Sequence, residues 1–155
     1  MNKKNTLLFF LCLFSLWAVA QEKKPVKIAC VGNSITYGSE IKNQFQNSYP
    51  GLLSQLLGEG YDVRNFGISA RVMLNKGDHP YMHEQKFRDL LAFQPDIVTI
   101  KLGTNDSKPW NWCYGKDFGK DLTEMLDILQ DLPSKPKIYL CLPVPAVKRN
   151  FGIND

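Results

Sequence analysis

The chain has 155 residues, a formal net charge of +4 and 44% hydrophobic residues, which together indicate one globular domain. Charged residues make up 22%, and 11 glycines and 9 prolines are spread along the chain. This composition excludes disordered, collagen-like and coiled-coil proteins.

Residues 1–20 have the pattern of a secretory signal peptide. Lys3 and Lys4 precede an apolar run over residues 7–20, which ends in Ala18-Val19-Ala20. We expect cleavage after Ala20 and a secreted or periplasmic protein whose domain spans residues 21–155. The run is shorter than the roughly 20 apolar residues of a membrane span, so no stable membrane anchor is expected.

The mature chain carries a net charge of +2, because the two lysines of the leader are lost. Its basic residues are dispersed, which argues against nucleic acid as a partner. Cys30 and Cys141 lie in apolar runs and Cys113 in a polar one. We therefore expect two buried thiols and no disulfide framework.

Short apolar runs that end at glycine or proline alternate with stretches of helical periodicity. The runs predict strands at residues 26–31, 61–66, 96–102 and 137–142. The periodic stretches predict helices at residues 48–57, 83–93 and 117–132. This alternation is typical of an α/β fold with a parallel sheet covered on both faces. The long connections over residues 34–47, 67–82 and 104–116 follow the carboxyl ends of strands, where such sheets bind ligands.

Three of these strand ends carry groups suited to acyl transfer. Ser34 follows the first strand beside Gly32, Gly67 ends the second strand, and Asn105 follows the third. In the common doubly wound strand order these three ends are neighbours. A serine oxygen that attacks an ester carbonyl creates an oxyanion, and the amides of Ser34 and Gly67 with the Asn105 side chain would be its donors.

The same residues resemble the SGNH, or GDSL-type, hydrolases. Gly32-Asn33-Ser34 is similar to the first block of that family, with asparagine where aspartate is usual, and Gly67 matches the glycine of the second block. Gly103-Thr104-Asn105-Asp106 matches the third block. The resemblance implies a three-layer, flavodoxin-like α/β fold, Ser34 as nucleophile, and Gly67 and Asn105 as oxyanion donors. It is greatest to secreted bacterial carbohydrate acetylesterases of the sialate O-acetylesterase-like type.

The last block of that family, Asp-x-x-His, supplies the general base, and no such motif follows Cys141. The histidines are His79 and His83, which we interpret as surface residues rather than a substitute base or, with Asp78, a metal site. The chain is therefore expected to be an amino-terminal fragment that lacks the last strand, the last helix and this block.

Further candidates surround these blocks. Trp110 and Trp112, with Tyr114, follow the third block, where their rings would either stack on a sugar or pack as a small core of the loop. Arg71 would either pair with a substrate carboxylate or remain solvated, and Asn33 lies beside the nucleophile as a substrate contact.

The sequence thus predicts a secreted serine esterase that removes acetyl or another short acyl group, with a small-molecule or glycan ester as substrate. The alternative is a non-catalytic carbohydrate-binding or scaffold protein of the same fold. A flavodoxin-like cofactor binder is disfavoured because the first loop lacks a glycine-rich or hydroxyl-rich phosphate cradle. No cofactor and no metal are expected.

Overall fold

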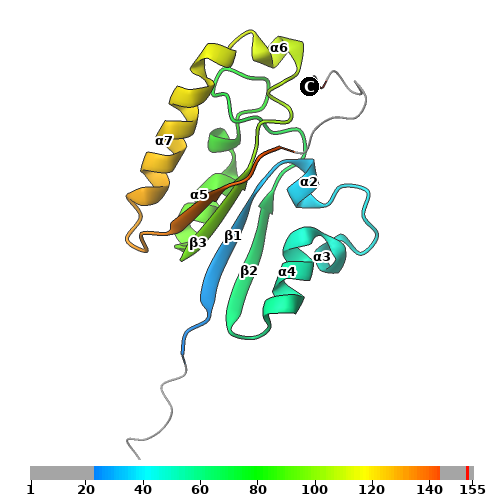
Figure 1. The fold of residues 1–155 in the computed structure, drawn as a ribbon, viewed down its shortest axis with the longest axis vertical. Helices are drawn as coiled ribbons and strands as arrows, with labels where there is room; N and C mark the ends of the chain where they lie inside the picture. Colours follow the sequence, from blue (N-terminus) through cyan, green and yellow to red (C-terminus); the bar gives the residue numbers. More distant parts are fainter. Residues whose placement is uncertain (1–22, 144–152, 154–155) are drawn as a thin grey trace, which may run out of the picture.

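The computed structural model describes residues 23–143 and residue 153. Within them, the sheet has four parallel strands in the order β2-β1-β3-β4 (Figure 1). The strands are β1 (Val26–Gly32), β2 (Tyr61–Gly67), β3 (Ile97–Lys101) and β4 (Lys137–Leu140). This order makes the carboxyl ends of β2, β1 and β3 direct neighbours, as the sequence predicts.

Helices connect the strands. The α-helices are α2 (Ser34–Tyr37), α3 (Gln44–Asn47), α4 (Tyr49–Leu57), α5 (Gln85–Phe93), α6 (Pro109–Trp112) and α7 (Phe118–Gln130). Two 3-10 turns are η1 (Tyr81–His83) and η2 (Gly115–Asp117). Figure 1 shows α5 and α7 on one side of the sheet and α4 on the other, so the chain has three layers.

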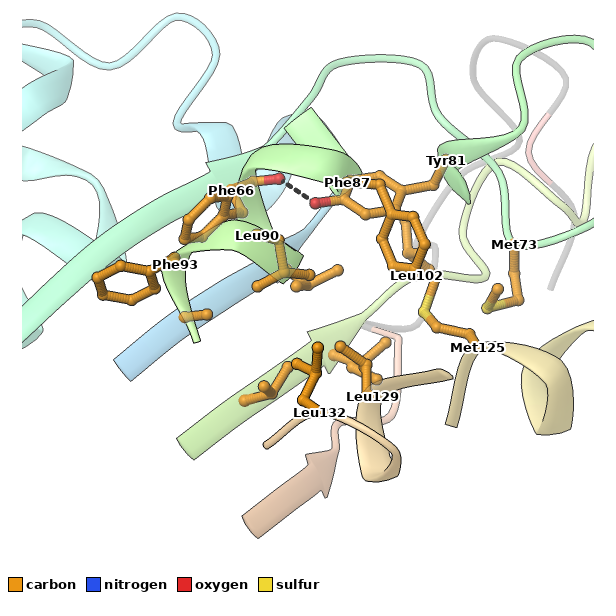
Figure 2. Packing of buried hydrophobic residues seen from close by; sticks show 14 residues of the cluster. Phe66, Met73, Tyr81, Phe87, Leu90, Phe93, Leu102, Met125, Leu129 and Leu132 are labelled. Carbon is orange, nitrogen blue, oxygen red and sulfur yellow. Dashed lines mark hydrogen bonds between the residues drawn. The ribbon is translucent and has the colours of Figure 1, made fainter. Parts of the chain in front are cut away.

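The main core lies between the sheet and the pair α5 and α7. Strands β1 and β3 contribute alternate apolar residues, which α5 and α7 cover with phenylalanine, leucine and methionine side chains (Figure 2). The hydroxyl of buried Tyr81 donates to the carbonyl oxygen of Phe66 over 2.7 Å. This bond ties the η1 turn to the end of β2, because a buried hydroxyl needs a partner.

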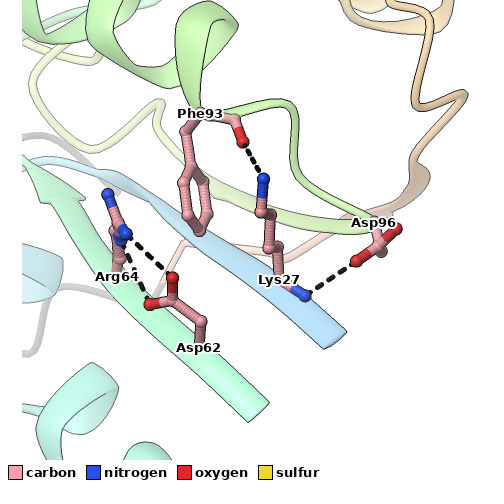
Figure 3. Close-up of polar contacts among 5 residues, drawn as sticks. All are labelled: Lys27, Asp62, Arg64, Phe93 and Asp96. Atoms are coloured by element: carbon pink, nitrogen blue, oxygen red, sulfur yellow. Dashed lines mark hydrogen bonds and ion pairs between the residues drawn. The ribbon is translucent and has the colours of Figure 1, made fainter. Parts of the chain in front are cut away.

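The opposite end of the sheet is held by polar contacts (Figure 3). The ammonium of Lys27 donates to the carbonyl oxygen of Phe93 over 3.0 Å, and the Lys27 amide donates to the Asp96 carboxylate over 2.8 Å. These bonds fasten the start of β1 to the turn between α5 and β3.

The predicted strands and the predicted helices are all confirmed, with ends shifted by one to a few residues. Two connections hold more structure than the sequence predicts. The segment after β1 contains α2 and α3, and the segment after β3 contains α6 and η2. Helices of four residues give too short a periodic signal to be recognised.

One expectation about the cysteines is wrong. Cys30 of β1 is buried, and burial raises the pKa of its thiol, whereas Cys141 is exposed just beyond β4. β4 lies at the edge of the described sheet, and Leu140 and Leu142 are exposed there as well.

The predicted leader, residues 1–20, lies outside the described residues. No helix within the described part of the chain is long and apolar enough to cross a membrane.

Candidate active site

Ser34 is the first residue of the short helix α2, immediately beyond the end of β1. Asn33 caps this helix, since its side-chain oxygen accepts from the Ile35 amide over 3.1 Å. A Cβ atom on Gly32 would lie 2.1 Å from the Thr36 hydroxyl oxygen. Only glycine therefore allows the chain to turn from β1 directly into α2.

Asn33 itself is almost fully buried, with 1% exposure. Its side-chain oxygen is engaged in the helix cap. In the structure Asn33 therefore shapes the turn that carries Ser34, and its side chain is not exposed as a substrate contact would be.

Gly67 ends β2 directly beneath α2. A Cβ atom there would lie 2.3 Å from the Tyr37 amide nitrogen, so the glycine lets helix and strand approach. The Gly67 amide donates to the side-chain oxygen of Asn65 over 2.9 Å. The donor that the sequence assigns to an oxyanion thus has a partner within its own strand.

Asn65 joins β2 to the helix that carries Ser34. Its side-chain amide donates to the carbonyl oxygens of Thr36 and Tyr37 at 3.0 and 3.2 Å, while its oxygen accepts from Gly67. One side chain therefore connects the carboxyl end of α2 with the end of β2.

The loop after β2 brings a second backbone amide to this edge. Ala70 has a φ of 66°, in the left-handed region that costs an L-residue about 1–2 kcal/mol. Within the described residues its N–H has no hydrogen-bond partner. Such backbone strain is typical of functional loops.

This loop touches both of the other strand ends. The Ser69 hydroxyl lies 2.7 Å from that of Ser39, whose amide donates to the Ser34 carbonyl oxygen. The Asn105 side-chain amide donates to the Arg71 carbonyl oxygen over 3.1 Å, which uses one of its two hydrogens. The segments with Ser34, Ala70 and Asn105 thus meet at one edge of the sheet.

Asp106, next to Asn105, holds this loop from below. One carboxylate oxygen accepts from the amides of Met73 and Leu74, both over 2.8 Å, and the side chain is fully buried. Burial raises the pKa of Asp106 above its ordinary value, although the backbone donors act in the opposite direction. The buried carboxylate fixes the loop after β2 to the end of β3.

A second set of bonds positions the aromatic helix α6. The Asn111 side chain accepts from the Asp78 amide at 2.9 Å and donates to the Asn105 carbonyl oxygen at 3.0 Å. The indole N–H of Trp110 donates to the Asp78 carboxylate over 3.1 Å. Partial burial raises the pKa of Asp78, but the bonds from Trp110 and Asn111 outweigh it, and the pKa lies below its ordinary value.

The rings of Trp110 and Trp112 remain 53% and 55% exposed. Trp112 packs beside Phe118, with ring centroids 6.3 Å apart. Each tryptophan thus contacts the protein on one side and solvent on the other. This arrangement is compatible with stacking on a sugar and with packing as a small core of the loop.

Arg71 already has a carboxylate partner within the chain. Its guanidinium is 2.8 Å from Glu84 and also donates to the Ser69 carbonyl oxygen over 3.0 Å. A substrate carboxylate would therefore compete with Glu84 for this side chain.

Neither histidine is hydrogen-bonded to Ser34 in the part of the chain that the structure describes. His79 and His83 are exposed, and among the described residues no side chain is hydrogen-bonded to the Ser34 hydroxyl. In the same part of the chain, no cluster of three or more histidine, cysteine or acidic side chains is arranged to hold a metal ion.

Sequence reasoning missed the roles of three side chains and one backbone amide. Asn65 lies two residues before Gly67, Asp106 is the last residue of the third block, and Asn111 lies six residues after Asn105. Their partners are distant in sequence, so only the fold reveals them. The left-handed conformation of Ala70 carries no signal either, because alanine does not favour it.

The sequence matches a family model and a relative of known name. The sequence model of the GDSL-like Lipase/Acylhydrolase family matches residues 30–155. An acetylxylan esterase of Xylanibacter ruminicola is 49% identical over 153 residues, which cover 88% of this chain and 32% of that protein. The chain thus spans about a third of the length of this relative.

Solved structures share the fold at lower identity. The inhibitor-bound aryl esterase of M. smegmatis has a TM-score of 0.66 at 23% identity, covering 77% of this chain and 65% of that chain. AlinE4, an SGNH-hydrolase family esterase, has a TM-score of 0.55 at 23% identity and covers 76% and 58%. These neighbours confirm the predicted flavodoxin-like, SGNH-type α/β fold.

Proposed function

Because the chain belongs to the GDSL-like lipase/acylhydrolase family, we propose that its protein is a secreted serine esterase that removes acetyl groups from a carbohydrate. The observation that carries the proposal is the meeting of Ser34, the loop around Ala70 and Asn105 at one sheet edge. Secretion rests on the predicted leader over residues 1–20.

In the proposed reaction the Ser34 oxygen attacks the acetyl carbonyl carbon. The hydroxyl proton passes to a general base and then to the departing sugar oxygen, which leaves an acetyl-serine ester. Water then attacks this ester, releases acetate and restores the serine hydroxyl. The base is proposed to come from outside residues 23–143, since no described side chain is hydrogen-bonded to the serine.

Three donors are proposed for the oxyanion. The Ser34 amide at the start of α2 has no described partner, and Asn105 keeps its second side-chain hydrogen. The Ala70 amide is the third donor in place of Gly67, because the Gly67 amide is engaged by Asn65. Each such donor is worth about 10²- to 10³-fold in rate.

An acetylated xylan is the proposed substrate. The relative that is 49% identical is named for this activity. The open faces of Trp110 and Trp112, which α6 carries beyond the third strand end, offer the flat apolar surface that sugar rings pack against. In this proposal both residues contact the substrate, while Arg71 and Asn33 support the site through Glu84 and the helix cap.

A covalent trap tests the proposal. The full protein is incubated with diethyl p-nitrophenyl phosphate, and the modified residue is located by mass spectrometry, while acetate release from acetylated xylan is measured in parallel. We expect a single phosphorylated residue, Ser34, and loss of acetate release in proportion to its modification. Acetate release without modification at Ser34 contradicts the assignment of the nucleophile. Xylan binding without acetate release supports the alternative of a non-catalytic carbohydrate-binding protein.

A further inference from the structure

A groove with a volume of about 850 Å³ runs along β2, which is an edge strand of the sheet among the described residues, beside the candidate active site. Residues 62–65 of β2 form its floor, Pro50 and Ser54 of α4 line one wall, and Lys86 of α5 reaches it from the other face of the sheet. This volume lies within the range of about 300–1,000 Å³ that is typical of ligand sites. None of the oxyanion donors or tryptophans lines it.

Aromatic and neutral polar side chains are combined in this groove. Phe45 of α3 is 92% exposed at its margin, and Tyr37 stands at one end. The side chains of Gln46 and Ser54 also line the groove, and neither has a hydrogen-bond partner within the described residues. Flat apolar faces beside unused amide and hydroxyl groups suit the alternating apolar and hydroxylated surfaces of sugars.

Three charged side chains line the groove: Asp62 and Arg64 neutralise each other, and Lys86 keeps its charge. Arg64 is paired with Asp62 at 2.8 Å, and its guanidinium also lies 4.2 Å from the ring centroid of Phe93 (Figure 3). The ammonium of Lys86 lies 5.9 Å from the ring centroid of Tyr37. A cation–π contact leaves the ammonium charged, so the groove carries one positive charge without a carboxylate partner among the described residues. One ammonium among neutral polar and apolar side chains is a weak anion site, and the groove favours a neutral ligand.

The groove is continuous with the segment that carries the nucleophile. Tyr37 is the last residue of the helix that starts at Ser34, about 5 Å away along the helix axis. Asn65 lines the groove and holds both the Tyr37 carbonyl oxygen and the Gly67 amide. A chain molecule lying in the groove would therefore extend toward Ser34.

We propose that this groove binds the main chain of the neutral polysaccharide whose acetyl groups are removed at Ser34, with a sugar ring packed on Phe45. The proposal rests on the proposed function for its choice of sugar. An added peptide strand is the competing occupant of a free sheet edge. The observations favour the glycan, because the edge presents the charged pair of Asp62 and Arg64, and charged residues oppose strand addition.

The test uses two matched exposed residues. Phe45 lines the groove, whereas Leu56 of α4 is 84% exposed and does not line it. Neither Phe45→Ala nor Leu56→Ala removes a buried contact, so both variants should fold.

Xylohexaose, which carries no acetyl group, is titrated into the full protein by calorimetry. We expect Phe45→Ala to raise Kd about three- to tenfold, as for the loss of one aromatic contact, and Phe45→Trp to restore it. Leu56→Ala should bind as the parent does.

The outcomes separate this inference from the proposed function. Xylohexaose binding that depends on Phe45 supports the groove even if the full protein releases no acetate from xylan. The groove is rejected if the parent does not bind xylohexaose, or if Phe45→Ala binds it as tightly as the parent. It is also rejected if an extended peptide, but not xylohexaose, protects the amides of residues 62–65 from hydrogen exchange.

Discussion

The loop after β2 and the helix after β1 meet at the same edge of the sheet, but different contacts hold them in place. The loop is held by buried side chains from distant segments: Asp106 accepts from Met73 and Leu74, and Asp121 accepts from Asn75 over 2.7 Å. The helix is held by its own cap, by the close approach of two glycines and by one side chain of the neighbouring strand, Asn65.

This difference separates two requirements of ester hydrolysis. Oxyanion donors must be positioned before the reaction begins, and the loop is preorganised by bonds that do not involve substrate. A nucleophile must instead gain a partner that takes its proton, and the Ser34 hydroxyl has none within the described residues. Under the proposed function, the described part of the chain holds the proposed donors in place but gives the Ser34 hydroxyl no hydrogen-bond partner.

The largest effect should come from the nucleophile. In the full protein we expect Ser34→Ala to lower kcat for an aryl acetate by about 10⁴- to 10⁶-fold, because a covalent route is lost. Asn105→Ala removes one donor and should cost only about 10²- to 10³-fold. Measurements of kcat on both variants check this order, provided that their circular dichroism spectra match that of the parent. A Ser34→Ala variant with parental turnover would remove the distinction between the two regions.

The next effect concerns the anchor of the loop. Asp106→Ala leaves the amides of Met73 and Leu74 without an acceptor, and we expect the free energy of unfolding to fall by about 3 kcal/mol. Urea denaturation measures the change, and Asp127→Ala on an exposed part of α7 is the control. An unchanged midpoint for Asp106→Ala would show that the loop does not depend on this carboxylate.

The same carboxylate predicts a pH dependence. Because burial raises the pKa of Asp106 in the folded state, the folded chain takes up the proton at a higher pH than the unfolded chain does. Its contribution to the free energy of unfolding is therefore full at low pH and falls as the pH rises from the ordinary aspartate pKa through the raised value. Asp106→Asn should flatten the stability curve in this window, and an identical slope for parent and variant would contradict the direction of the shift.

A smaller effect is expected where the two regions are joined. Asn65→Ala should lower kcat about tenfold, since α2 loses its two bonds from this side chain of β2, each worth about 1 kcal/mol. Asn65→Asp keeps an acceptor for Gly67 but turns a carboxylate oxygen toward the carbonyls of Thr36 and Tyr37. If the amide donors position Ser34, Asn65→Asp should be at least as impaired as Asn65→Ala, with KM nearly unchanged for both. Full activity of Asn65→Asp would restrict the residue to capping Gly67.

The smallest effect is expected at the aromatic helix. Trp110→Ala should raise KM for acetylated xylan about three- to tenfold, because one ring contact with the sugar is lost. Trp110→Phe keeps a ring but loses the bond to Asp78, so it separates stacking from anchoring. Equal KM values for parent and Trp110→Ala would assign this ring to packing alone.

Short-range patterns are sufficient to predict much of this protein. The ends of β1 at Gly32 and of β2 at Gly67, and the end of β3 two residues before Gly103, follow from apolar runs that stop at glycine. The parallel order follows from the alternation of strands and helices. Ser34 and Asn105 are recognisable as candidates because each lies within four residues of the end of a strand, where parallel sheets bind ligands.

What the tertiary structure alone decides is which polar groups are free and which are already bonded. Gly67 has the right position, but its amide is engaged by Asn65, whereas Ala70 presents an amide without a described partner. From the sequence alone Arg71 has no evident acidic partner, whereas in the fold its guanidinium lies 2.8 Å from the Glu84 carboxylate. Hydrogen bonds and burial depend on groups that are distant in sequence, so the local pattern names the candidates, and three-dimensional packing determines which of them remain available for chemistry.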